Sequence, residues 1–499
     1  MWSAVGQAFG MVFEPYTLMV MVIASFYGLF VGAVPGLTAT MATALLVPVT
    51  FFMAPVPAIA AIVTATAMAI FSGDIPGCLL RIPGTPASAA YTDEAFAMTK
   101  KGQAEMALGA GLVFSAVGGL FGTLVLILAA PALADFAIKF SSFEYFWLVL
   151  LGLTCAVFIT SDRPLKGLIT LFLGLLVACV GLGNPAGFPR FTFGNTEMTG
   201  GIGMISMMIG MFAISEIIRY MVDTSPQAEL VVEQVGNVLK GQWTLAKKYP
   251  VQILRGSVLG TAVGALPGAG ADIAAWMSYA MSKKFSKEPE KFGTGHVEGI
   301  VESGSANNSA LAGAWIPALV FGIPGDSITA IVIGVLYMKN MNPGPSLFTN
   351  NPQNIYAIFL IFILANIIMI PLGILCIKAS RRILKVPRNI LMPIILLFCV
   401  VGTFAINNSL FEIGVMLVAG LVAYVLEEND FPIAPAILGV VLGGMLEENF
   451  ITSMIKSDGN LMAFVGRPIA ATLAVITVLV WVMPLVMALL RKRRVQQLA

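Results

Sequence analysis

Four Pro-Gly pairs interrupt apolar stretches of this chain, at 35–36, 83–84, 267–268 and 324–325. Small, hydroxyl or acidic residues that can begin a new helix follow each pair. Proline lacks an N–H and glycine relaxes the backbone, so each pair leaves backbone groups without helical partners. The N–H groups and positive dipole at the start of a following helix attract anions, most naturally a carboxylate. The four breaks therefore predict an anion-binding site.

The predicted substrate-binding residues belong to these breaks or lie close to them in the sequence. They are Pro35, Gly36, Thr38, Arg81, Gly84, Thr85, Ser88, Gly268, Ala269, Gly270, Asn307, Asn308, Gly325 and Ser327. The two asparagines can donate to a carboxylate and coordinate a cation, or they can join helices by packing. Arg81 can pair with a carboxylate, reach the membrane interface or neutralise Asp74. Kinking or close helix contact is the alternative role of the Pro-Gly pairs.

Three aspartates lie in or beside the interrupted segments, where an ionisable group is costly unless it is functional or paired. Asp74, Asp272 and Asp326, together with Asn307, are the candidates for binding a coupling Na⁺ or H⁺. Each aspartate can instead cap a helix, and Asp326 directly follows a Pro-Gly pair. We expect no catalytic residue, no bound metal other than Na⁺ and no organic cofactor.

The composition places these segments in a membrane. The 499 residues are 58% hydrophobic and 11% charged, with a mean hydropathy of +0.91. Charged residues make up about a quarter of a soluble protein. Between Pro15 and Gly73 there is no Asp, Glu, Lys or Arg. We therefore expect an all-α polytopic protein of roughly 10–12 transmembrane segments.

The chain also resembles itself. Residues 28–36, GLFVGAVPG, match 260–268, GTAVGALPG, at six of nine positions, and RIPGTPASA at 81–89 aligns with GIPGDSITA at 322–330. Basic residues precede only the second copy, so the two copies are predicted to begin on opposite sides of the membrane. Inverted repeats with broken helices are typical of secondary transporters. We assign 1–250 to a first half with its N-terminus outside and 251–499 to an inverted second half with a cytoplasmic C-terminus.

Several functional classes lack their sequence signals. A net charge of +2 gives no basic face for a nucleic acid. The chain has no Gly-x-x-x-x-Gly-Lys-Ser/Thr phosphate loop and no His-Glu-x-x-His or Gly-x-Ser-x-Gly motif, so we expect a transporter driven by an ion gradient and not an enzyme. An anion channel and a membrane-embedded assembly factor or enzyme are the alternatives.

In these same motifs the chain resembles the large membrane subunit, of TctA type, of the tripartite tricarboxylate transporters. The resemblance lies in GAVPGLTATMATALLVPVTF at 32–51, IPGTPASAA at 82–90, LPGAGADIAAWMSYAMSKKF at 266–285, SANNSALAGAWIPALVFGIPGDSITA at 305–330 and NPGPSLF at 342–348. It spans nearly the whole chain. Ser303 and Gly304 stand where the family commonly has Pro-Glu.

The resemblance implies a multi-pass permease of a bacterial inner membrane, importing a carboxylate such as citrate with Na⁺ or H⁺. It implies two protein partners, a small membrane subunit of about four helices and a periplasmic substrate-binding protein. Assembly of the chain into a homo-oligomer is a further alternative. The resemblance does not specify which carboxylate is imported, or whether Na⁺ or H⁺ is the coupling ion.

Overall fold

The computed structural model describes residues 2–160, 164–183, 187–222, 236–384 and 388–482. Within these ranges the regular structure is helical, apart from one isolated bridge between Gly181 and Arg190. The helices divide the chain into two compact units, each made of two separate stretches. Unit 1 combines 1–135 with 203–429, and unit 2 combines 136–202 with 430–499. The all-α prediction is confirmed.

Unit 1 contains all the Pro-Gly breaks. Its first stretch holds α1 (Trp2–Val12), α2 (Pro15–Ala33), α3 (Ala39–Phe51), α4 (Pro55–Ser72), α5 (Asp74–Leu80), α6 (Pro86–Ala89), α7 (Thr92–Lys100) and most of α8 (Ala104–Ala137). Its second stretch holds α11 (Met204–Ile209), a π-helical turn (Gly210–Ile214), α12 (Ser215–Val222), α13 (Gln242–Lys248), α14 (Pro250–Gly264), α15 (Gly270–Phe285), a 3₁₀ turn (Pro289–Lys291), α16 (Val297–Phe321), α17 (Ser327–Met338), α18 (Pro345–Asn350), α19 (Pro352–Ile383), α20 (Arg388–Asn407) and α21 (Leu410–Glu428).

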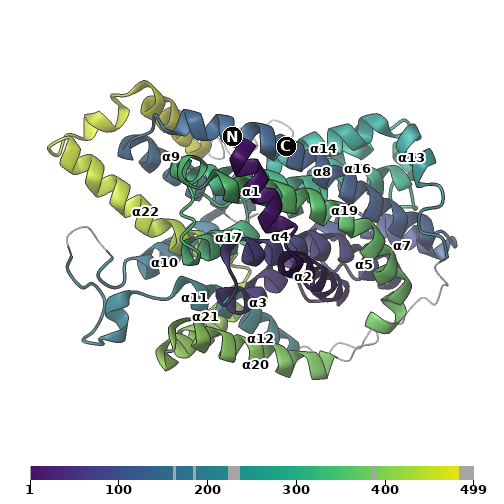
Figure 1. The fold of residues 1–499 in the computed structure, drawn as a ribbon, viewed down its shortest axis with the longest axis horizontal. Coiled ribbons are helices and arrows are strands. Elements are labelled where there is room, and N and C mark those ends of the chain that lie inside the picture. The colour runs from purple at the N-terminus through teal and green to yellow at the C-terminus, as the bar shows by residue number, and fades with distance from the viewer. Residues whose placement is uncertain (1, 161–163, 184–186, 223–235, 385–387, 483–499) are drawn as a thin grey trace, which may run out of the picture. The chain divides into compact units, whose positions relative to one another are not determined.

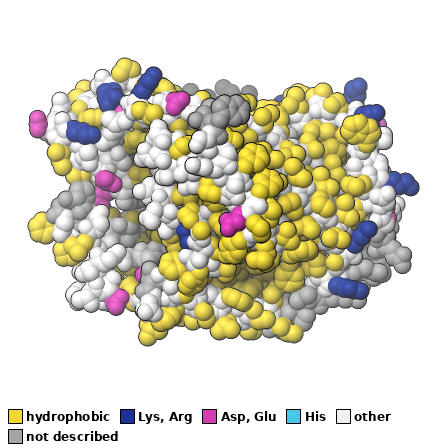
Figure 2. Space-filling model, viewed as in Figure 1, with side chains coloured by type: hydrophobic (Ala, Val, Ile, Leu, Met, Phe, Trp, Pro, Cys, Tyr) yellow, Lys and Arg dark blue, Asp and Glu magenta, His cyan; other side chains and the backbone are white. Residues whose placement is uncertain are grey.

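Several of these helices are suited to a bilayer. Seven helical stretches of the described residues are long and apolar enough to cross it, and shorter apolar helices accompany them. One face of unit 1 is broadly apolar in Figure 2, with Lys and Arg side chains near its edge. Phe9 of α1, Phe13 between α1 and α2, and Ile23 of α2 are 46%, 47% and 59% exposed. In water these side chains would be unfavourable, whereas lipid accepts them, which agrees with a polytopic membrane protein.

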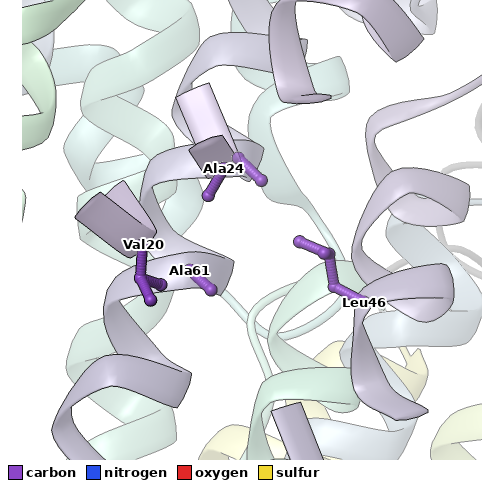
Figure 3. Close-up of a cluster of buried hydrophobic side chains, with 5 residues drawn as sticks. Val20, Ala24, Leu46 and Ala61 are labelled. Carbon is purple, nitrogen blue, oxygen red and sulfur yellow. The ribbon is translucent and has the colours of Figure 1, made fainter. Parts of the chain in front are cut away.

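Small residues allow the first helices to pack closely. Val20 and Ala24 of α2, Leu46 of α3, and Ala61 and Ala65 of α4 form a buried apolar cluster (Figure 3). On the same side of α2, a Cβ added at Gly28 would lie 2.2 Å from the carbonyl oxygen of Ala65. Such an approach is open only to glycine. Close packing therefore fixes α2, and the break at its end, against α4.

An equivalent pair occurs in the second half of the sequence. Helix α14 lies beside α16, as α2 lies beside α4 (Figure 1). A Cβ at Gly260 would lie 2.3 Å from the carbonyl oxygen of Ala306. Glycines at equivalent positions thus place the second pair of breaks on a similarly packed helix pair.

Unit 2 carries none of the predicted site residues. It holds α9 (Ser142–Thr160), α10 (Pro164–Ala178), a 3₁₀ turn (Glu197–Gly200), α22 (Ala434–Lys456), a second 3₁₀ turn (Leu461–Val465) and a further apolar helix over Pro468–Val482. Helix α22 packs against α9 and α10. The Arg190 guanidinium binds the Glu447 carboxylate through two hydrogen bonds of 2.7 Å.

The units do not coincide with the predicted repeats, because each unit draws residues from both halves of the sequence. The division at 250 and the opposite orientation of the halves stay predictions. The basic cluster at 491–494, which supported a cytoplasmic C-terminus, lies outside the described residues.

Candidate functional site

The first break in each half ends one helix and starts another after a short turn. Helix α2 ends before Pro35, and α14 ends before Pro267. The glycines that follow have left-handed backbones, with φ of 88° at Gly36 and 83° at Gly268. A side chain would be strained there, which explains the second residue of each pair. Thr38 then caps α3 by accepting from the Met41 N–H at 3.1 Å.

The second break in each half has an even closer match. Helix α5 is followed by Arg81 and α16 by Gly322, and both residues have a left-handed backbone, with φ of 60° and 68°. After the Pro-Gly pair, Thr85 forms a capping box with Ser88 at the start of α6. Asp326 forms the same box with Thr329 at the start of α17. The cap is one of the two roles that the sequence leaves open for Asp326.

Glycines in the second breaks also hold the paired segments together. A Cβ at Gly84 would lie 2.5 Å from the carbonyl oxygen of Gly32. At Gly325 it would lie 2.6 Å from that of Gly264. Each glycine therefore lets its turn reach the end of the neighbouring interrupted helix. This close contact is the role that the structure gives to Gly84 and Gly325.

Interrupted helices of the two halves meet. Helix α3 packs against α17, and α15 packs against α6. At the start of α15 the Asp272 carboxylate lies near the backbone N–H of Ala87 in α6. Next to it, a Cβ at Gly270 would lie 2.7 Å from the Asp326 Cβ. Of these two residues, Asp272 is exposed and Asp326 is partly exposed.

The far ends of two of these helices are also connected across the halves. Lys339 follows α17, and its ammonium donates to the carbonyl oxygens of Phe51 and Met53, both at 2.7 Å. These carbonyls lie at the C-terminal end of α3, where a cation is favoured by the helix dipole. Helices α3 and α17 are thus joined at one end by a charged contact.

A buried polar cluster lies deeper, between α5 and α16. The Tyr91 hydroxyl donates to Asp74 Oδ1 at 2.6 Å, and the Asn307 amide donates to the Tyr91 oxygen at 3.3 Å. Asp74 is 5% exposed, and Asn307 is fully buried. Asp74 Oδ2 and Asn307 Oδ1 have no hydrogen-bond partner. Tyr91 thus joins one candidate from each half, although no motif or spacing in the sequence singled out this tyrosine.

Asn308 lies next to this cluster. It is 2% exposed, and its amide nitrogen is 3.5 Å from both the Ala67 carbonyl oxygen and the Met369 sulfur. Its side-chain oxygen has no partner. Because the contacts of this amide nitrogen are long and the oxygen has no partner, the Asn308 side chain can form hydrogen bonds with a ligand.

Arg81 is not joined to these carboxylates. Its Nε donates to Asp93 at 2.8 Å, and the Arg81 side chain is 59% exposed. Among the ion pairs of the described residues, none includes Asp74, Asp272 or Asp326. The region therefore contains three carboxyl groups without a basic partner.

The remaining candidates are backbone positions or small residues. Ser88 is 1% exposed and engaged in its capping box, and Thr85 is 5% exposed. Pro35, Gly268 and Ala269 are buried, whereas Ser327 is partly exposed at the start of α17. These residues shape the turns and leave the Asp and Asn side chains as the polar groups of the region.

A second carboxylate contact between the halves involves Glu94 of α7. Glu94 is fully buried and accepts from the Tyr279 hydroxyl at 2.8 Å. It also accepts from the backbone N–H groups of Gly293, Gly295 and His296. Lys101 reinforces this contact by donating to the Thr294 carbonyl oxygen at 2.6 Å. No local sequence signal pointed to this clamp, because its partners lie about two hundred residues away.

Glu302 occupies the altered family motif near Ser303 and Gly304. It is fully buried and forms two hydrogen bonds with the Arg255 guanidinium. The Ser278 hydroxyl donates to its backbone carbonyl oxygen at 3.1 Å. Glu302 therefore joins α16 to α14 and α15, and its charge is balanced within the second half.

The fold and the paired breaks define a polytopic membrane protein whose interrupted helices meet in one unit. Comparison with known families then gives its identity. The tripartite tricarboxylate transporter TctA family matches residues 18–438, and the chain belongs to this family. It is accordingly a component of a tripartite transport system that includes partner subunits and a binding protein.

Two similar proteins come from Agrobacterium vitis. The chain is 34% identical over 466 residues to an uncharacterized 52.8 kDa protein in the TAR-I ttuC' 3' region, covering 93% of this chain and 92% of that protein. It is 36% identical over 214 residues to an uncharacterized protein in the TAR-II ttuC' 3' region, covering 43% of this chain and 88% of that protein. No solved structure matches the chain significantly.

Proposed function

We propose that this chain is the permease subunit of a secondary active transporter that imports a carboxylate, such as citrate or another di- or tricarboxylate. Uptake is coupled to a Na⁺ or H⁺ gradient. The protein lies in a bacterial inner membrane, works with a small four-helix membrane subunit, and receives its substrate from a periplasmic binding protein. Family membership supports transport as the general activity.

The observation that carries this proposal is the meeting of interrupted helices from the two halves. The Asp272 carboxylate contacts the backbone of α6, and Gly270 lies against Asp326 at the start of α17. In secondary transporters built from inverted repeats, the substrate and ions bind where such broken helices meet. The repeated turns and the crossed packing of α3 with α17 and of α15 with α6 support this architecture.

The charges around the meeting point favour coupled transport over an anion channel. A carboxylate substrate here approaches Asp272 and Asp326, and no Lys or Arg pairs with either among the described residues. Like charges at close range repel strongly where water is scarce. The substrate therefore needs accompanying cations, which neutralise this repulsion and tie its entry to theirs.

Uptake into proteoliposomes that contain this chain with its small subunit and binding protein tests the proposal. Labelled mono-, di- and tricarboxylates are supplied under an inward Na⁺ gradient, an inward H⁺ gradient or neither. We expect saturable uptake of one carboxylate class, dependent on a gradient and on the binding protein. Flux that needs no cation gradient would instead indicate a channel. Absence of carboxylate uptake in all conditions would refute the proposed substrate class.

The aspartates can be tested in the same assay. Asp272→Asn retains the size of the side chain but removes its charge, and we expect it to change the dependence of uptake on the cation gradient. Asp458→Asn is the matched control, because Asp458 is exposed in unit 2 and away from the breaks. If both variants retain the wild-type response, Asp272 has no part in coupling.

A further inference from the structure

The buried carboxyl group of Asp74 has an unusual environment for a membrane protein. It lies at the start of α5, within a helical stretch that is long and apolar enough to span the bilayer. One of its oxygens is bound by the Tyr91 hydroxyl, and the other has no partner. An ionised carboxylate without full hydrogen bonding or a counter-charge is very costly in such surroundings.

The nearest helices offer no counter-charge. Ionisable groups on α5 and α7 are bound to other partners: Cys78 to Thr99, Asp93 to Arg81, Glu94 to the 293–296 segment, and Lys100 to the Phe96 ring. Helices α4 and α6 contain no ionisable side chain. Tyr91 is therefore the titratable group on this side that contacts Asp74.

The other surrounding helices give the same result. On α2, Tyr16 is exposed and Tyr27 donates to the Ala42 carbonyl oxygen. On α8, Glu105 accepts from the Gly236 N–H and Asp135 is exposed. On α16, Glu298 binds Gln252 and Glu302 binds Arg255. On α8 it is Gly111 that faces Asp74, since a Cβ there would lie 2.7 Å from Oδ2.

The hydrogen bonds of the buried polar cluster are all donated in one direction, towards Asp74. Asn307 donates to the Tyr91 oxygen, and Tyr91 in turn donates to Asp74 Oδ1. Oδ1 is thereby occupied as an acceptor, which leaves Oδ2 to carry an added proton. A metal ion would need several oxygen ligands around it. In the cluster that Tyr91 joins, the oxygens without partners are Asp74 Oδ2 and Asn307 Oδ1, which are too few to surround a metal ion, whereas a proton needs only one of them.

We propose that Asp74 is the proton-binding group of this transporter, and that Tyr91 and Asn307 position its carboxyl group. The inference rests on the function proposed above and assigns its coupling ion. A proton from water on one side of the membrane forms an O–H bond at Oδ2, and this bond breaks when the proton leaves to water on the other side. No electron is exchanged, and the neutral acid is the form that the apolar surroundings accommodate.

Asp74 is also linked to the meeting point of the interrupted helices. Helix α5 leads directly through Arg81 and the Pro83-Gly84 turn to α6, which packs against α15 with its Asp272 near the Ala87 N–H. Asn307 brings the second half to the same carboxyl group. A change in the proton at Asp74 therefore acts on both halves at the place where the substrate is proposed to bind.

Infrared spectroscopy of the full chain in lipid nanodiscs tests the proposal without any transport measurement. We expect the wild-type protein to show a carbonyl band of a buried protonated carboxylic acid, and Asp74→Asn to lose that band. Tyr91→Phe removes the bond to Oδ1, so the band should remain but shift in frequency, which a merely structural role for Tyr91 would not produce. Asp93→Asn is the control, because Asp93 is exposed and paired with Arg81.

The outcomes separate this inference from the proposed function. A wild-type spectrum unchanged by Asp74→Asn in a folded protein, as judged by its elution and thermal unfolding, overturns the proton assignment even if carboxylate uptake is observed. A Na⁺-dependent rise in thermal stability that Asp74→Asn abolishes, without an acid band, overturns it in favour of Na⁺. In the reconstituted complex, Asp74→Asn should lose the part of uptake that depends on the H⁺ gradient. Lack of wild-type carboxylate uptake refutes the proposed function instead.

Discussion

The two second breaks, between α5 and α6 and between α16 and α17, have the same backbone but different side chains. Both end a helix in a left-handed residue, pass through Pro-Gly, and begin the next helix with a capping box. At the position equivalent to Asp74, however, the second half has Trp315, which is 1% exposed and packs edge-on against the Phe362 ring at 5.2 Å. The two halves thus repeat the backbone of the turn but differ in the ionisable side chain beside it.

The asymmetry extends to the amides. Asn307 and Asn308 of α16 correspond to Thr66 and Ala67 of α4, which cannot offer the same groups. One half thus supplies a carboxyl group and the other supplies amides, and they meet through Tyr91. Exposure differs too, because Pro83 is exposed whereas Pro324 is buried. Although the two halves have similar backbone turns, each therefore brings different polar side chains to the region where they meet.

The largest effect is expected from Asn308→Ala, which tests the unrepeated chemistry. Asn308 has an unpartnered oxygen, and its equivalent in the first half already ends in a methyl group. We expect saturable uptake to fall to background in the reconstituted complex. Asn350→Ala, at an exposed position after the breaks, should retain uptake. Unchanged affinity and rate in Asn308→Ala would remove this residue from the site.

Glu94→Ala tests the clamp that joins the halves away from the breaks. The substitution removes four hydrogen bonds to one buried carboxylate and leaves backbone N–H groups without partners. We expect the free energy of unfolding to fall by about 3 kcal/mol, because each buried donor left unsatisfied costs about 1–3 kcal/mol. Thermal unfolding in detergent measures the loss.

Glu94→Gln provides the comparison for this clamp. Its amide keeps one accepting oxygen and should lose less stability than Glu94→Ala. Equal stability of all three proteins would show that the contacts of Glu94 contribute nothing to holding the halves together.

Gly84→Ala and Gly325→Ala test the repeated turns directly. Their added methyl groups would lie 2.5 and 2.6 Å from the carbonyl oxygens of Gly32 and Gly264. We expect each to lower the free energy of unfolding by about 2 kcal/mol, as overpacking typically does. Gly414→Ala has open space around it and should be neutral or stabilising. Clearly unequal losses at the two turns would break the equivalence of the halves.

The smallest effect is expected from Arg81→Gly, which gives the first half the residue type of the second. A left-handed residue other than glycine costs roughly 1–2 kcal/mol, but glycine loses more entropy on folding. The two effects oppose each other, so the unfolding free energy should change by less than about 1 kcal/mol. Transport measured alongside should be retained, and its loss would show that the Arg81 guanidinium acts in the site.

Local sequence features predicted the backbone of the site well. The four selected Pro-Gly pairs lie at real turns, whereas Pro76-Gly77 lies within α5. Thr38 and Asp326 occupy the cap positions that their residue types favour. The glycines at Gly36 and Gly268 have the left-handed conformation that only glycine adopts without strain. These features depend on a few neighbouring residues, so a single sequence reveals them.

Contacts between distant segments could not be read in the same way. Nothing near Tyr91 indicates that it bridges Asp74 and Asn307, because the bridge requires α5 and α16 to be packed together. The proximity of Ala87 to Asp272 likewise depends on tertiary structure. The compact units, each built from two separate stretches, follow from such long-range packing and not from the order of the repeats.

The bond between Lys339 and the end of α3 has a mechanical consequence. Because the ammonium donates to two carbonyl groups of the other half, sliding α17 along its axis without α3 would break both hydrogen bonds. Relative motion of these two helices is thereby disfavoured, and we expect them to move together as one strut. Any motion that exposes the bound cargo first to one compartment and then to the other would carry this strut as a single piece.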